Sequence, residues 1–175
     1  VDLDTVKNYN LNIKAIFLTH CHFDHIMFLN QLEEFYSCPI YISEIDYKGM
    51  FDKEINLSKF FHRDFSINFD KSLIMTFKDG EIIHIDAFKI ITILTPGHTS
   101  GSACFLVDNN LFSGDTLFAD NIGRTDFPTS SVEQQKSSLL KLDSLNYKIL
   151  YPGHSEISTK EKQKYNINFW FNLLN

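Results

Sequence analysis

The chain has 175 residues, 43% of them hydrophobic and 14% aromatic, which suits a globular domain with a real core and excludes a disordered protein. Its formal net charge of −6 argues against a nucleic-acid surface, and no run of about 18 apolar residues predicts a membrane span. Three well-separated cysteines form neither a disulfide framework nor a C-x-x-C motif, which favours a reducing, cytoplasmic location. We therefore expect one domain over residues 1–175, without nucleic-acid or membrane partners.

The first half of the chain predicts strands alternating with helical segments. Apolar runs indicate the strands, and apolar side chains recurring every three or four residues indicate the helix. In chain order we expect a strand at 13–18, a helix at 26–36, a strand at 40–42 and a loop or short-helix insert at 50–79. The phenylalanines of this insert are expected in the core more often than in a cleft.

The second half predicts a run of strands followed by two helices. The strands are indicated by β-branched runs and the helix starts by capping boxes, Ser130-x-x-Glu133 and Ser158-x-x-Glu161. In chain order we expect strands at 81–85, 88–94, 103–107 and 111–112, a helix at 130–142, a strand at 147–151 and a C-terminal helix.

Four metal-binding side chains lie within six positions directly after the first predicted strand. They form the pattern H-x-H-x-D-H, made by His20, His22, Asp24 and His25. Histidine and carboxylate side chains at this density suit metal ligation better than packing. Asp24 has a second interpretation, as the N-cap of the helix expected from Ile26.

Three further candidate ligands also follow predicted strands. His98 and His154 each come directly after a Pro-Gly turn, and Asp115 stands in Ser113-Gly114-Asp115-Thr116. Strand ends on a rigid sheet are a common position for functional side chains. Together with the first cluster these make seven candidate ligands, too many for one tetrahedral zinc. Seven ligands fit two metals that share a bridging carboxylate.

These motifs together resemble the metallo-β-lactamase superfamily. The segments that carry the resemblance are H-x-H-x-D-H, Thr95–Thr99, Gly114–Phe118 and Tyr151–His154. The continuation Ile122–Pro128 is similar to the short form of the hydroxyacylglutathione hydrolase (glyoxalase II) branch. The resemblance implies an α/β fold, a four-layer αββα sandwich of two mixed sheets with helices outside. Members normally begin with a strand hairpin, so we expect this chain to lack its N-terminal strands.

The resemblance also implies a ligand set and a chemistry. His20, His22 and His98 would hold one divalent metal; Asp24, His25 and His154 would hold the second; Asp115 would bridge them. Asp24 and Asp115 are the expected catalytic carboxylates. Zinc is the default ion, although iron and manganese also suit such ligands. A metal-bridging hydroxide would attack a thioester, and an S-acylglutathione is the leading small-molecule substrate.

Two other functions compete with this interpretation. A mononuclear iron persulfide dioxygenase on the same fold would bind iron through His20, His98 and Asp115 alone. A metal-binding module without activity would bind metal but hydrolyse no thioester. The number of metals per chain distinguishes the dioxygenase from the thioester hydrolase. Thioester turnover distinguishes the inactive module from it.

Several neighbouring residues are expected to play other roles. Cys21 should point away from its histidine neighbours in an extended segment and is expected not to be a ligand. His62 and His84 lack metal-type spacing and are expected at the surface or in ordinary strand positions. Arg124 and Asp126 are two positions apart. We expect them to form an ion pair that either supports the metal site or is purely structural.

Overall fold

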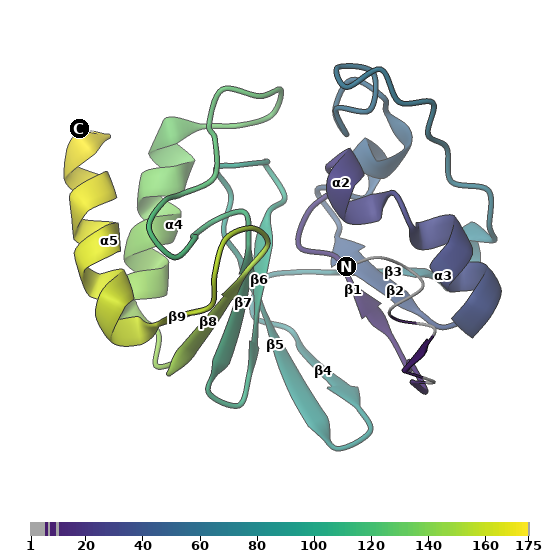
Figure 1. Ribbon diagram of the computed structural model, residues 1–175, viewed down its shortest axis with the longest axis horizontal. Helices are drawn as coiled ribbons and strands as arrows, with labels where there is room; N and C mark the ends of the chain where they lie inside the picture. The colour runs from purple at the N-terminus through teal and green to yellow at the C-terminus, as the bar shows by residue number, and fades with distance from the viewer. Residues whose placement is uncertain (1–5, 7, 10, 175) are drawn as a thin grey trace.

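The computed structural model describes residues 6, 8, 9 and 11–174, which form two sheets with helices on their outer faces (Figure 1). The strands are β1 (Ile16–Phe17), β2 (Ile40–Ser43), β3 (Ile74–Phe77), β4 (Ile82–Ile85), β5 (Phe88–Leu94), β6 (Ala103–Val107), β7 (Asn110–Gly114), β8 (Ile149–Pro152) and β9 (Ser158–Thr159). The helices are α2 (Phe23–Ile26), α3 (Leu29–Tyr36), α4 (Val132–Ser144) and α5 (Lys160–Leu173), with short 3₁₀ turns at Lys48–Phe51 and Lys71–Leu73.

The first sheet has the order β1-β2-β3 and the second the order β4-β5-β6-β7-β8-β9. In the second sheet β7 and β8 run parallel and the other neighbours antiparallel, so it is mixed, as expected. The first sheet differs, because all of its described strands run parallel. A long connecting segment leads from the end of each strand back to the edge of the sheet where the next strand begins. Connections of this kind join parallel strands.

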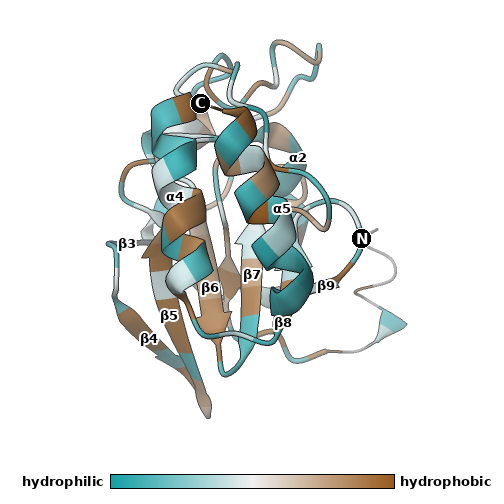
Figure 2. Ribbon diagram, turned by 90° about the vertical axis from the view of Figure 1, so that its left-hand side faces the viewer, coloured by the Kyte–Doolittle hydropathy of each residue, from teal (hydrophilic) through white to brown (hydrophobic). Residues whose placement is uncertain are grey.

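Three hydrophobic clusters hold the layers together. One packs α4 and α5 against the second sheet, and Figure 2 shows these helices lying over its strands. Another packs α2, α3 and part of the 50–69 segment against the first sheet. The third lies between the sheets, where Phe105 contacts Phe17 and Phe77 at ring-centroid distances of 5.3 and 5.5 Å. The layer order is therefore helix, sheet, sheet, helix, the metallo-β-lactamase fold.

The structure corrects several predicted element boundaries. The helix expected at 26–36 is divided into α2 and α3, because Phe28 (φ −99°, ψ 5°) leaves the helical region. The strand expected at 13–18 is shortened to Ile16–Phe17. The insert expected as loop and short helix contains the whole of strand β3 at its end.

Both helix caps lie one residue later than predicted. Ser131 accepts a hydrogen bond from the Gln134 amide at 3.3 Å, and Thr159 accepts one from Lys162 at 3.5 Å. The predicted caps have other partners: Ser130 donates to the Phe127 carbonyl at 2.6 Å, and Ser158 belongs to β9.

The phenylalanines of the insert fall into three groups, of which Phe51 and Phe69 are partly buried. Phe65 and Phe77 are buried, as expected, at 8% and 1% exposure. Phe60 and Phe61 are 64% and 52% exposed, so the expectation of a core position is wrong for them. None of the helices in the described part of the chain has the length and apolar character needed to cross a membrane.

Candidate metal centre

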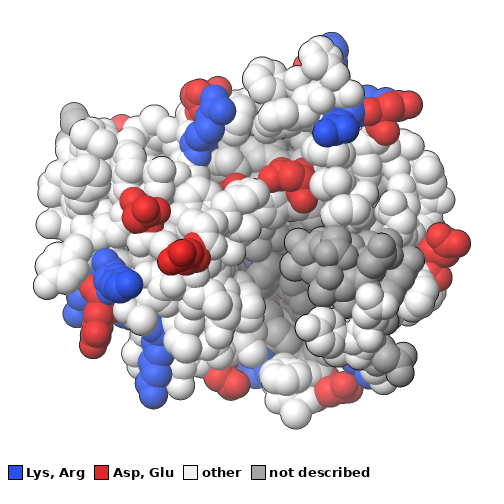
Figure 3. Space-filling view, in the orientation of Figure 1, with Lys and Arg blue, Asp and Glu red and all other residues white. Residues whose placement is uncertain are grey.

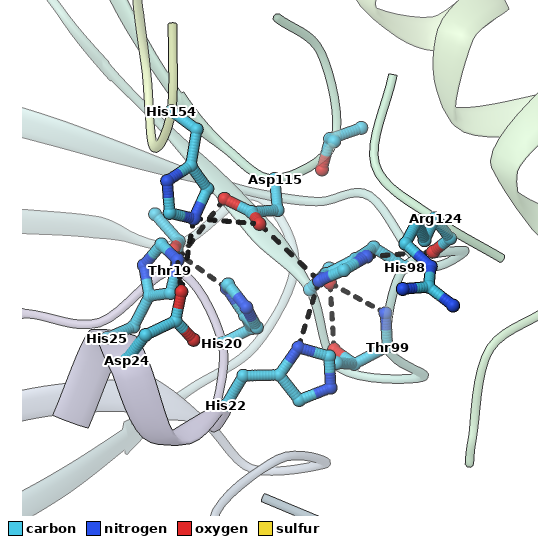
Figure 4. Close-up of polar contacts among 12 residues, drawn as sticks. Thr19, His20, His22, Asp24, His25, His98, Thr99, Asp115, Arg124 and His154 are labelled. Carbon is cyan, nitrogen blue, oxygen red and sulfur yellow. Dashed lines mark hydrogen bonds and ion pairs between the residues drawn. The ribbon is translucent and has the colours of Figure 1, made fainter. Parts of the chain in front are cut away.

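All seven candidate ligands converge at one end of the two sheets (Figure 4). Those from the first-sheet side are His20 and His22, in the loop after β1, and Asp24 and His25, on α2. Those from the second sheet follow β5, β7 and β8 and are His98, Asp115 and His154. The strand ends therefore bring segments far apart in the sequence to one point.

Three histidines form the buried part of the site. His20, His22 and His98 are 1–3% exposed, and one ring nitrogen of each lies within 4.8 Å of the others. His22 Nδ1 and His98 Nε2 are 2.9 Å apart. His20 Nε2 is buried without a hydrogen-bond partner in the described residues, although buried polar atoms normally have one. Three buried ring nitrogens this close together fit a metal ion.

A backbone carbonyl fixes the tautomer of His98. His98 Nδ1 lies 2.8 Å from the carbonyl oxygen of Arg124, which can only accept a hydrogen bond. In the neutral imidazole Nδ1 must therefore carry the proton, which leaves the lone pair on Nε2, the atom that faces the site. This arrangement is typical of metal-binding histidines, whose second nitrogen donates to a carbonyl or carboxylate.

Three other candidates form the open part of the site. Asp24, His25 and His154 also place one ligand atom each within 4.8 Å of the others. His154 Nε2 lies 3.1 Å from Asp24 Oδ2, and both side chains are about half exposed, at 56% and 49%. Asp24 and His154 therefore face solvent, where a substrate can approach them, whereas the His25 side chain is only 16% exposed.

Asp115 contacts members of both groups. Its Oδ1 lies 3.2 Å from His25 Nε2, and its Oδ2 lies 3.5 Å from His154 Nε2 and 3.6 Å from His98 Nε2. The carboxylate is buried, at 8% exposure. One buried carboxylate between two groups of ligands is the arrangement that a bridging ligand requires.

The environment keeps the buried histidines neutral. Burial lowers the pKa of His20 well below its ordinary value, and the nearby histidines lower it further. Burial also lowers the pKa of His22 to about 3 and lowers that of His98, although Asp115 opposes both shifts. Neutral imidazoles offer the lone pairs that metal ligation needs.

The pKa values of His25 and Asp115 shift in the direction of an ion pair. Burial alone would lower the pKa of His25, but its contact with the Asp115 carboxylate and the nearby Asp24 raise it overall. Burial alone would raise the pKa of Asp115, but His25, His98 and His154 lower it overall. Asp115 is therefore ionised at neutral pH and available as an anionic ligand.

The two Pro-Gly turns use glycine for different reasons. Gly97 has φ +149°, a conformation that side chains rarely adopt, and it packs against Gln135. Gly153 has no positive φ, but a Cβ there would overlap Asp115 Oδ1. Gly97 is therefore required for its backbone conformation, and Gly153 because its backbone passes close to the Asp115 carboxylate.

One buried carboxylate that the sequence did not single out as part of the site joins the two ligand loops. Asp46, 3% exposed, accepts hydrogen bonds through Oδ2 from the Cys21 amide at 3.0 Å and from Thr99 Oγ1 at 2.8 Å. Cys21 lies between His20 and His22, and Thr99 follows His98. The Asp46 backbone amide donates a hydrogen bond to Ser43 Oγ at 3.2 Å, which fixes the turn after β2.

We expect Asp46→Ala to lower the free energy of unfolding by about 3 kcal/mol, because two buried donors lose their acceptor. Metal affinity should fall by roughly 10- to 100-fold, as for other residues that orient metal ligands. Chemical denaturation and metal titration measure the two effects. The exposed helical variant Glu34→Ala serves as the control. Wild-type metal affinity in Asp46→Ala would remove Asp46 from the support of the site.

The remaining predicted residues lie as follows. Cys21 is fully buried and absent from every group of ligand atoms found in the described residues, and all three cysteines are free. His62 and His84 are exposed and likewise absent from these groups. Asp24 is not a helix cap, because the N-cap position of α2 is His22 and no side chain caps it. Arg124 and Asp126 form a bidentate ion pair at 2.8–2.9 Å.

A cleft of about 590 Å³ opens over the site. Figure 3 shows acidic and basic side chains near the upper edge of both halves of the molecule. The residues that line the cleft include five of the candidate ligands, His22, Asp24, His98, Asp115 and His154; the others are Phe23, Leu57, Phe61, Arg63, Phe118, Asn121, Ile122, Arg124 and Phe127.

Comparison with known proteins agrees with this fold. The family model of the metallo-beta-lactamase superfamily matches residues 10–154. A probable metallo-hydrolase of Methanocaldococcus jannaschii is 35% identical over 88% of this chain and 75% of its own length. Hydroxyacylglutathione hydrolase GloC of Haemophilus influenzae is 33% identical over 93% of this chain and 78% of its own length.

A solved structure shows the same fold. The crystal structure of the BLEG-1 B3 metallo-beta-lactamase superposes with a TM-score of 0.85, at 27% identity, over 96% of this chain and 82% of that one. The chain belongs to the metallo-beta-lactamase superfamily. Its relatives are named metallo-hydrolases, and its clustered histidines and aspartates supply the ligand types that a metal-dependent hydrolase needs.

Proposed function

We propose that the protein is a binuclear metal-dependent hydrolase that cleaves a thioester. The observation that carries the proposal is the position of Asp115 between two separate groups of ligand atoms. His20, His22 and His98 would hold the first metal, and Asp24, His25 and His154 the second, with Asp115 shared between them. A mononuclear site would leave the second group without a use.

The donor set fits two divalent ions. Two carboxylates and five histidine nitrogens suit zinc, and they also suit iron or manganese. Zinc is the ion we propose. The unpartnered His20 Nε2 and the fixed tautomer of His98 support ligation independently of the family resemblance.

The chain's own residues prepare the site for hydrolysis. Bound divalent ions supply an activated water at neutral pH and polarise a substrate carbonyl. Asp115 balances part of their charge because it is ionised and buried. Asp24 is half exposed, which places its carboxylate where a proton can be exchanged with substrate or solvent. The Arg124 carbonyl holds His98 in the required tautomer throughout.

Support for a thioester substrate comes from one relative. GloC of Haemophilus influenzae is named a hydroxyacylglutathione hydrolase, and the 33% identity covers most of both chains. The motif continuing from Gly114 to Pro128 resembles the same branch. An S-acylglutathione is therefore the first substrate to test, followed by thioesters of other small thiols.

The test combines metal analysis with a panel of thioesters, beginning with S-lactoylglutathione. We expect two metals per chain and release of a free thiol, detected by a thiol reagent. A single iron per chain with persulfide oxidation would instead favour the dioxygenase. Two metals without thioester turnover would favour the module that lacks activity. Either result would contradict the proposed function.

A further inference from the structure

Arginine is unusually rare in this chain, and its distribution is uneven. Among 16 basic residues only Arg63 and Arg124 are arginines, and the other 14 are lysines. They stand far apart in the sequence, yet both line the cleft over the candidate metal centre. Lysine is absent from the residues that line this cleft. The cleft therefore contains the two side chains best suited to bind a carboxylate in a bidentate manner.

Arg124 is already engaged. Its guanidinium donates to both oxygens of Asp126, at 2.9 and 2.8 Å, and lies 4.2 Å from the centre of the Phe127 ring. This pairing neutralises its charge and fixes its position. Arg124 therefore lines the wall of the cleft with its charge already offset by Asp126.

The Arg63 guanidinium, unlike that of Arg124, has no acidic partner among the described residues. In the described part of the chain its guanidinium makes no ion pair and no hydrogen bond; only its backbone amide is bonded, to the Ser58 carbonyl. Asp64, its acidic neighbour, is paired with Lys53 Nζ at 2.8 Å. Arg63 is exposed and lines the same cleft as Asp24 and His154. A cation in a cleft without an internal partner is available to an anionic ligand.

Aromatic side chains lie on the same walls. Phe61 and Phe127 line the cleft, and Phe60 contacts both rings, at centroid distances of 5.2 and 6.4 Å. Phe60 and Phe61 are exposed although they are large and apolar. Contact with an apolar portion of a ligand would remove this surface from water.

We infer that Arg63 is a specificity-determining residue that pairs with a carboxylate of the substrate, while Phe61 and Phe127 contact its apolar part. The inference rests on the proposed function, since the ligand it describes is a thioester. The carboxylate belongs either to the thiol portion, as in glutathione, or to the acyl portion, as in a dicarboxylic acid. Both sources present the same group to the guanidinium.

Binding and turnover are measured with Arg63→Gln, with Arg63→Lys as the conservative variant. Lys89→Gln is the matched control, because Lys89 is exposed on β5 and does not line the cleft. Calorimetry follows an S-alkylglutathione thioether, which is not hydrolysed, and its dimethyl ester. If the carboxylate belongs to the thiol portion, Arg63→Gln should weaken binding of the free acid about three- to tenfold and leave that of the ester unchanged; if it belongs to the acyl portion, neither should change. Arg63→Lys should restore part of the affinity.

Turnover distinguishes the two sources of the carboxylate. The substrates are a neutral acyl thioester of glutathione, a succinyl thioester of N-acetylcysteamine and the neutral acetyl thioester of N-acetylcysteamine. A higher KM at constant kcat for the first assigns the carboxylate to the thiol portion, and for the second to the acyl portion. An equal change for all three, or no change for any, would overturn the inference.

The same data separate this inference from the proposed function. Arg63-dependent binding of the thioether without turnover of any thioester would leave the inference standing and refute the thioesterase. Turnover of thioesters with thioether binding and KM values that are all unchanged in Arg63→Gln would do the reverse.

Discussion

Replacing Asp115 with asparagine is expected to remove bound metal and to lower thioester turnover by at least about a hundredfold, beyond the loss typical of residues that merely orient ligands. The substitution keeps the volume of the side chain but removes its charge. Asp115 lies within 3.6 Å of ligand atoms from both groups. Losing its charge should therefore weaken both metal sites at once.

Elemental analysis and steady-state kinetics measure the two effects of Asp115→Asn. Asp120→Asn is the matched control, since Asp120 is exposed and is absent from the groups of ligand atoms. It should keep the wild-type metal content and turnover. Two metals per chain in Asp115→Asn together with wild-type turnover would refute the bridging role.

His98→Ala is expected to have the second-largest effect. It removes one nitrogen of the buried group, leaves His22 Nδ1 without its neighbour at 2.9 Å and leaves the Arg124 carbonyl without its donor at 2.8 Å. Metal content should fall from two ions per chain to one or fewer. Turnover should fall at least about a hundredfold.

Two histidine variants make the comparison specific. His84→Ala should leave both metal content and turnover unchanged, because His84 is exposed on β4 and outside the ligand groups. His154→Ala should remove the open site while the buried site retains its ion. Equal metal loss in His84→Ala and His98→Ala would contradict the assignment of ligands.

The candidate site was more predictable than the fold details around it. The spacing of His20, His22, Asp24 and His25 and the two Pro-Gly-His turns are local features, and sequence alone shows them. Their convergence depends on which strand ends share an edge. The expectation that they converge came from the family resemblance and from the general position of functional loops on sheets. The structure brings all seven side chains together.

Residues that act through distant contacts could not be predicted. Asp46 bonds to Cys21 and Thr99, which are 25 and 53 positions away, so no local pattern marks it. Gly153 looked like a turn glycine, and its proximity to Asp115 is visible only in three dimensions. The helix caps were each displaced by one residue because adjacent serine and threonine side chains compete for one position.

The ligands come from both halves of the molecule, four from one and three from the other, and this has a consequence for folding. His20, His22, Asp24 and His25 belong to the side of the first sheet, and His98, Asp115 and His154 to the second. Loaded metals would therefore act as cross-links between the layers. An ion that binds only the folded chain adds about 2.7 kcal/mol of stability at a hundred times its Kd. Metal supply would then set not only the activity of the protein but also how strongly its two halves unfold as one unit.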